Sequence, residues 1–233
     1  YWYYLLSIEK ICWKRKAKKK RNLKIMKKYS YVGIAFIILI FGIYAVPKIV
    51  NKFKTPQLIT IAKVPNFEFT NQNGQLISNS FYEGKVYVVE FFFTTCPTIC
   101  PKMNENMVKI QNEFYGNLDF GIASFSINPK YDTPEILKQY ATDHGATLKN
   151  WNFLTGDQDK IYELANAGFT LYAGENSNAE GGFEHSGMFA LIDKKGIIRS
   201  RLDEHGNPIA FYEGLEAKGV QMIKEDIAIL LKE

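Results

Sequence analysis

Two cysteines stand directly after a long apolar run, and this junction restricts the fold more than any other part of the chain. Residues 86–93 read VYVVEFFF, and after two threonines the segment CPTICP occupies residues 96–101. β-Branched and aromatic residues in such a run are typical of a buried strand. Residues 102–115 carry apolar side chains at helical spacing, and Pro97 suits the first position of a helix. The pattern predicts a strand, then the cysteines, then a helix over about 97–115.

The spacing of the cysteines indicates their chemistry. On a regular first helical turn, Cys96 and Cys100 would lie on the same face of the helix. The positive end of the helix dipole stabilises a thiolate, so it lowers the pKa of a cysteine placed there. Such a pair can bind a soft metal ion or exchange with a disulfide. A purely structural disulfide is a weaker interpretation, because so short a loop adds little stability.

The positive charge of the chain is confined to its N-terminal end. Residues 1–28 hold eleven Lys/Arg and one acidic residue, whereas residues 51–233 hold 17 basic and 23 acidic residues. The net charge of +5 therefore does not describe the larger part of the chain, which is mildly acidic. We expect no nucleic-acid partner.

A charge-free stretch follows the basic residues. Residues 29–46 read YSYVGIAFIILIFGIYAV, which predicts a single transmembrane helix over 29–50 behind a basic cytoplasmic tail at 1–28. The positive-inside rule then places the following domain outside the cytoplasm, so we expect a single-pass protein of the inner membrane. A cleaved signal peptide is the alternative, although no clear A-x-A site is present. Another alternative is that residues 1–25 are not translated, because Met26 begins an ordinary membrane-targeting start.

The remaining sequence alternates between strand and helix patterns. After a linker at 51–60, we expect one domain over 61–233. The alternation predicts an α/β fold with a central mixed sheet flanked by helices, and a cysteine pair at the end of a central strand is the thioredoxin-like arrangement. The expected elements are a hairpin at 67–77, strands at 86–93, 120–127, 188–193 and 197–202, and helices at 97–115, 134–144, 157–168 and 215–232.

Four motifs in this order resemble the Sco/SenC family, membrane-anchored thioredoxin-like copper proteins of cytochrome c oxidase assembly. The resemblance covers about residues 60–232. The motifs are FFTTCPTICP at 92–101, S-x-x-P-x-x-D-T-P at 126–134, W-x-F-L-T-G at 151–156, and His185-Ser186 followed by L-I-D-x-x-G at 191–196. Each motif alone is weak, but their order and spacing are specific.

The resemblance implies a copper site formed by Cys96, Cys100 and His185. Two thiolates and an imidazole suit a soft Cu(I) ion, and three protein ligands leave the metal accessible. The family often has Asp where this chain has Asn128 and Glu184. Glu184 could orient the His185 ring, or it could be a solvated loop carboxylate.

Other candidate ligands have simpler explanations. His144 stands at a predicted helix end, and His205 stands in a turn, so both are expected at the surface. Met103 and Met107 follow helical spacing and are expected in the core. The ligand set therefore stays at three residues.

The resemblance implies a metallochaperone rather than an enzyme that turns over a substrate. The protein would deliver copper to, or reduce the cysteines of, the binuclear copper site of cytochrome c oxidase. Its expected partners are the copper-bearing oxidase subunit and other copper chaperones. The alternative is a thiol–disulfide oxidoreductase, with Cys96 as the attacking thiolate and Cys100 as the resolving thiol. The three residues between the cysteines, together with His185, favour the metal.

Overall fold

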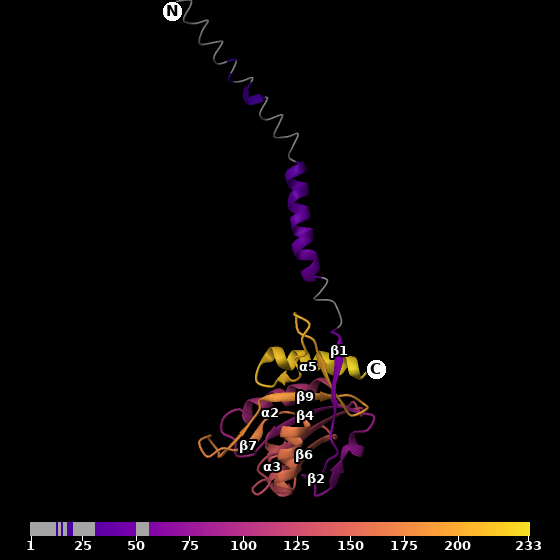
Figure 1. The fold of residues 1–233 in the computed structure, drawn as a ribbon, viewed down its shortest axis with the longest axis vertical. Coiled ribbons are helices and arrows are strands. Elements are labelled where there is room, and N and C mark those ends of the chain that lie inside the picture. Colours follow the sequence, from indigo (N-terminus) through magenta and orange to yellow (C-terminus); the bar gives the residue numbers. More distant parts are fainter. Residues whose placement is uncertain (1–12, 14, 16–17, 21–30, 50–55) are drawn as a thin grey trace, which may run out of the picture. The chain divides into compact units, whose positions relative to one another are not determined.

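The structure is a computed structural model that describes residues 13, 15, 18–20, 31–49 and 56–233 (Figure 1). The chain divides into two units, Tyr1–Thr55 and Pro56–Glu233. Among the described residues, one helix, Tyr31–Ile49, is long and apolar enough to cross a membrane, with a mean hydropathy of 2.3. The ends of the predicted anchor at 29–50, most of the tail at 1–28 and half of the linker lie outside the described residues.

The second unit holds all the strands and the remaining helices of the described chain. Its strands are β1 (Leu58–Lys63), β2 (Glu68–Asn71), β3 (Leu76–Ser78), β4 (Val86–Phe92), β5 (Phe120–Ser126), β6 (Trp151–Thr155), β7 (Ala173–Glu175), β8 (Phe183–His185), β9 (Met188–Ile192), β10 (Ile197–Arg201) and β11 (Tyr212–Glu213). Its helices are α2 (Cys100–Glu113), α3 (Pro134–Asp143), α4 (Gln158–Glu163) and α5 (Ala217–Leu230), with a 3₁₀ turn η1 (Asn79–Tyr82) and a π-helical turn η2 (Leu164–Gly168).

The main sheet has the order β1-β10-β9-β4-β5-β6-β2-β3, with β11 paired to β9. Strands β4, β5 and β6 are parallel, and the other neighbours are antiparallel. The parallel register of β4 and β5 runs without a break from the Val86–Phe120 pair to the Phe92–Ser126 pair. Both strands are buried along their whole length. The expected mixed sheet is therefore confirmed, and its buried centre ends at the cysteine segment.

Helices cover both faces of this sheet. Adjacent side chains of β4 point to opposite faces, so Phe91 and Phe92 contact different elements. The Phe92 ring packs against Tyr140 of α3, with ring centroids 5.3 Å apart. Phe91 packs on the other side against Phe169, just after η2, with centroids 5.7 Å apart. Met103 and Met107 of α2 are buried in the core, as their spacing predicted.

Several boundaries differ from the prediction. Helix α2 begins at Cys100 rather than near Pro97, and Pro101 is the proline of its first turn. Strand β1 begins at Leu58, inside the expected linker, because its backbone pairs with β10. Strand β6 covers most of the motif at 151–156, for which no strand was expected. The short strands β7, β8 and β11 were not expected either.

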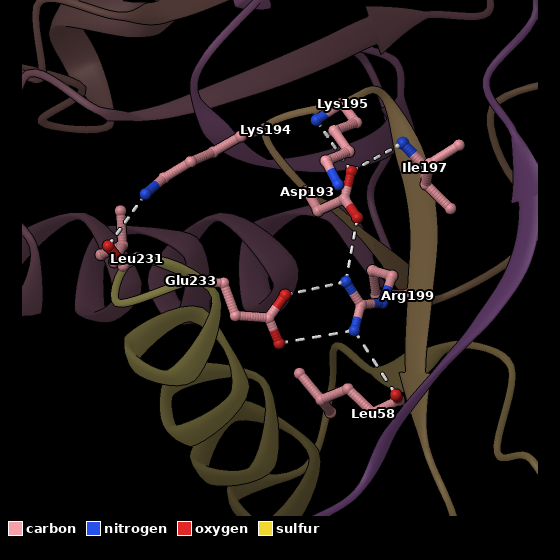
Figure 2. A network of polar contacts seen from close by, with 8 residues as sticks. All are labelled: Leu58, Asp193, Lys194, Lys195, Ile197, Arg199, Leu231 and Glu233. Carbon is pink, nitrogen blue, oxygen red and sulfur yellow. Dashed lines mark hydrogen bonds and ion pairs between the residues drawn. The ribbon is translucent and has the colours of Figure 1, made fainter.

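A polar network fixes one edge of the main sheet to the end of the chain (Figure 2). Arg199 of β10 donates to Asp193 at 3.0 Å and forms an ion pair with Glu233 at 3.0 Å. Its other terminal nitrogen donates to the carbonyl of Leu58 in β1, at 3.4 Å. One arginine thus joins the edge strand β1, the β9–β10 turn and the residues after α5.

Candidate metal centre

The two cysteines do not share a helix face, because Cys96 lies on the loop between β4 and α2 and Cys100 lies at the start of α2. Strand β4 ends at Phe92, and residues 94–99 form turns, in which the backbone N–H of Cys96 donates to the carbonyl of Phe93 at 3.2 Å. Cys100 is the first residue of α2. The expectation that both cysteines share a regular helical turn is therefore wrong. Pro97 lies in a bend of this loop. The loop, rather than a helical turn, brings the two sulfurs together.

The histidine comes from a separate two-stranded sheet. His185 ends β8, which pairs antiparallel with β7, and neither strand joins the main sheet. Phe93, the residue after β4, contacts this hairpin: its ring centroid lies 5.3 Å from that of Phe183 and 5.8 Å from the His185 ring. Gly181, with φ +86°, is also close to Phe93, since a Cβ there would lie 2.9 Å from the Phe93 ring. Phe93 thus seats the hairpin beside the cysteine loop.

The three predicted residues meet at one point. The ligand atoms of Cys96, Cys100 and His185 all lie within 4.8 Å of one another, and all three residues are buried. The Cys100 Sγ lies 3.1 Å from the His185 Nε2. The His185 Nδ1 lies 3.1 Å from the carbonyl oxygen of Ser186, and in the tautomer that donates this hydrogen bond the Nε2 lone pair faces Cys100. An imidazole held in this way points its lone pair at the sulfurs.

The two thiols differ in acidity. A hydrogen bond from Cys100 lowers the pKa of Cys96 well below the usual range, with further lowering by Thr98. The same hydrogen bond and burial raise the pKa of Cys100. The two shifts run in opposite directions, so Cys96 is the more acidic thiol of the pair. A soft metal ion binds thiolates, so its binding would displace the proton of the less acidic Cys100.

A cavity of about 460 Å³ lies against two of the three donors, Cys96 and His185. Phe93, Ile99 and Phe183 supply apolar walls, and Glu180 and Glu184 supply acidic groups. Glu184 accepts a hydrogen bond from Asn176 at 2.9 Å, whereas the His185 ring nitrogen bonds to a backbone carbonyl. The hypothesis that Glu184 orients this ring is not supported by these contacts.

Two buried carboxyl groups lie near the cysteine loop and were not among the predicted site residues. Glu90 of β4 is 1% exposed and accepts from the Ser124 hydroxyl at 2.7 Å. Burial raises the pKa of Glu90 to about 7. Asp132, after β5, is fully buried. The single charge inside the apolar run 86–93 was a signal for Glu90, and the motif at 126–134 contained Asp132.

The other predicted surface residues are confirmed. His144 is the C-cap residue of α3, and its ring lies 4.2 Å from the Tyr140 ring. His205 lies in an exposed turn. Neither belongs to the cluster of Cys96, Cys100 and His185.

Comparison with known proteins identifies relatives of this chain. The SCO1 protein homolog of Bacillus subtilis is 35% identical over 138 residues, which cover 58% of this chain and 71% of the relative. The solved structure of BsSco, described as a member of the Sco family of cytochrome c oxidase assembly proteins with a disulfide switch, is 29% identical. It covers 78% of this chain and 98% of its own, with a TM-score of 0.62.

A structure of yeast Sco1 with copper bound has a TM-score of 0.55, is 22% identical, and covers 72% of this chain and 90% of its own, which shows the fold alone. These likenesses confirm the thioredoxin-like fold. The family model described as SCO1/SenC matches residues 57–218, from β1 into α5. This span includes both cysteines and the histidine. The chain belongs to the SCO1/SenC family.

Proposed function

We propose that the chain binds one copper ion through Cys96, Cys100 and His185 and acts in the assembly of cytochrome c oxidase. The observation that carries the proposal is the meeting of two sulfurs and one imidazole nitrogen within 4.8 Å. Two donors come from the segment between β4 and the start of α2 and one comes from the β7–β8 hairpin, and the burial of all three residues removes them from most of the solvent. The oxidase-assembly relative BsSco supports the role, and the donor set of two thiols and an imidazole supports copper as the metal.

The donor set fits copper in both affinity and exchange. Thiolates and imidazole are soft or borderline ligands that favour Cu(I), and related N/S sets also hold Cu(II). Three protein ligands leave room for a fourth group, and the cavity beside Cys96 gives access to it. A donor that must pass its ion to another protein needs this accessibility.

The proposed role is to deliver copper to the binuclear copper site of the oxidase, or to reduce the cysteines of that site. The partner would be the copper-bearing oxidase subunit. The apolar helix Tyr31–Ile49 supports anchoring in the inner membrane, with residues 56–233 outside the cytoplasm.

The first test is the copper content of the reduced protein. The full chain, purified in detergent and reconstituted with Cu(I) without oxygen, should hold one copper per chain by elemental analysis. A Cys96→Ser/Cys100→Ser variant should hold none, because it lacks both thiolates. Folded wild-type protein without copper would refute the proposal.

A second candidate function is thiol–disulfide exchange, favoured by the unequal acidity of the thiols. A Cys96 thiolate can attack a disulfide, and Cys100 can resolve the mixed intermediate. This reaction does not use His185 as a ligand, so a His185 variant separates the two functions.

A further inference from the structure

Asp132 is a buried carboxylate whose hydrogen bonds lead directly to the cysteine loop. It lies between β5 and α3 and is fully buried. Its Oδ2 accepts from the backbone N–H of Thr94 at 3.1 Å, and its Oδ1 accepts from the Thr94 hydroxyl. The Ser126 hydroxyl also donates to Oδ2. A single side chain thus accepts three hydrogen bonds, two of them from one residue.

Thr94 is the residue through which this contact reaches the sulfurs. It stands between the end of β4 and Cys96, in the turn where the Cys96 N–H donates to the carbonyl of Phe93. Holding both the backbone and the side chain of Thr94 fixes where this turn leaves the sheet. The direction of the turn sets the position of the Cys96 Sγ relative to the other two donors.

The segment that carries Asp132 forms its own turn and also reaches the hairpin of His185. The carbonyl of Asn128 accepts from the backbone N–H of Tyr131 at 3.1 Å and of Asp132 at 2.9 Å. On the other side, Lys130 lies 3.8 Å from Glu175 of β7, the partner strand of the one that ends in His185. The segment therefore contacts both the cysteine loop and the histidine hairpin.

We propose that Asp132 is a positioning residue of the metal centre, which holds the Cys96 loop through Thr94 so that the three donors are together before the ion binds. This role rests on the proposed copper function. This role can be told from a general contribution to stability. The carboxylate bonds to Thr94 and Ser126, and only Thr94 belongs to the cysteine loop.

The chain offers a matched pair of variants that separates these possibilities. Thr94→Val removes the hydroxyl that ties the cysteine loop to Asp132 and keeps the shape of the side chain. Ser126→Ala removes a hydroxyl that bonds to the same carboxylate from β5. Each variant removes one hydroxyl donor, and Asp132→Asn removes the charge that accepts all three bonds.

Cu(I) affinity of the full chain in detergent, measured by competition with a chelator, is the first readout. We expect Thr94→Val and Asp132→Asn to weaken binding by about 10-fold or more, as outer-shell losses do. Ser126→Ala should leave the Cu(I) affinity close to that of wild type, because Ser126 bonds to the carboxylate from β5 and does not belong to the cysteine loop. If Asp132→Asn does not fold, Thr94→Val still decides the question.

The second readout needs no copper and tests the geometry of the dithiol directly. The equilibrium of the Cys96–Cys100 disulfide with glutathione should shift severalfold toward the dithiol in Thr94→Val, because a looser loop lowers the effective concentration of one thiol at the other. Unchanged affinity and unchanged equilibrium in folded Thr94→Val would overturn the proposal. An equal loss in Ser126→Ala would also overturn it. Absence of copper from the wild type would instead refute the proposed function, while the glutathione measurement would still test Asp132.

Discussion

The imidazole of His185 reaches the sulfurs from a hairpin outside the main sheet, on a segment separate from the cysteine loop. Its Nε2 lies 3.1 Å from the Cys100 sulfur, and its Nδ1–H is held by a backbone carbonyl. At the scale of single residues, this side chain distinguishes a metal site from a redox pair.

We expect His185→Ala to lower copper affinity by more than the roughly 10–100-fold typical of losing an outer-shell group, because it removes a proposed ligand. The cysteine pair should still form a disulfide and be reduced again. His144→Ala is the matched control, because His144 caps α3 outside the site. Competition with a chelator and thiol counting give the two readouts. Normal copper binding with a loss of reductase rate alone would make thiol–disulfide exchange the leading function.

At the scale of elements, the β7–β8 hairpin and its contact with Phe93 set the place of the histidine. Gly181 and Gly182 both have positive φ, at +86° and +81°. A Cβ on Gly181 would lie 2.9 Å from the Phe93 ring, whereas a Cβ on Gly182 would meet nothing within 4 Å. The two glycines therefore have similar backbones and different surroundings.

This difference predicts unequal effects of the same substitution. Gly181→Ala and Gly182→Ala should both lose about 1 kcal/mol of stability, because a side chain is strained at positive φ. Only Gly181→Ala should also weaken copper binding, since its methyl group pushes the hairpin from Phe93. Thermal unfolding and chelator competition on both variants give the comparison. Equal copper affinities would show that this contact does not place His185.

The elements also show what the sequence could predict. The apolar run 86–93 and the cysteine spacing were sufficient for a central strand that ends at a reactive pair, because burial on both faces leaves a continuous apolar pattern. Pro97 alone could not show that α2 begins only at Cys100, after a loop, because proline suits both a bend and the first turn of a helix. Strands β7 and β8 have three residues each, too few to show a period.

The site was predictable only in part, because some of its contacts join residues that lie far apart in the sequence. Cys96, Cys100 and His185 were named through motifs, and the structure brings them together. The link between Asp132 and Thr94 joins residues 38 positions apart, and no local pattern reports such a contact. Glu90 was visible as a charge in an apolar run, but its partner Ser124 lies on another strand.

At the scale of the whole molecule, Glu90 places a titratable group in the centre of the sheet. Its pKa is about 7 in the folded protein because burial disfavours the charged form, against 4.5 for an exposed glutamate. Between these two pH values the folded state binds more protons than the unfolded state. The contribution of Glu90 to stability therefore falls as pH rises through this window.

We expect Glu90→Gln to become more stable relative to wild type as pH rises from about 5 to 8, by up to about 3 kcal/mol. The neutral amide keeps the size of the side chain and does not ionise. The measurement is the difference in the free energy of unfolding between the two proteins at each pH, so that other titrating groups cancel. A difference that stays constant with pH would contradict a buried, ionising Glu90.

The division of the proposed ligands between two parts of the fold has a consequence for release of the ion. The sulfurs lie on the loop after β4 and on the first residue of α2, and the imidazole belongs to a pair of three-residue strands. A bound ion would act as a cross-link between these parts, so ion binding and hairpin docking would stabilise each other. Undocking the hairpin would then leave the ion on two sulfurs alone while the large sheet stays folded. If the chain passes on an ion as proposed, the free energy of release would then depend on a small local opening rather than on the stability of the whole fold.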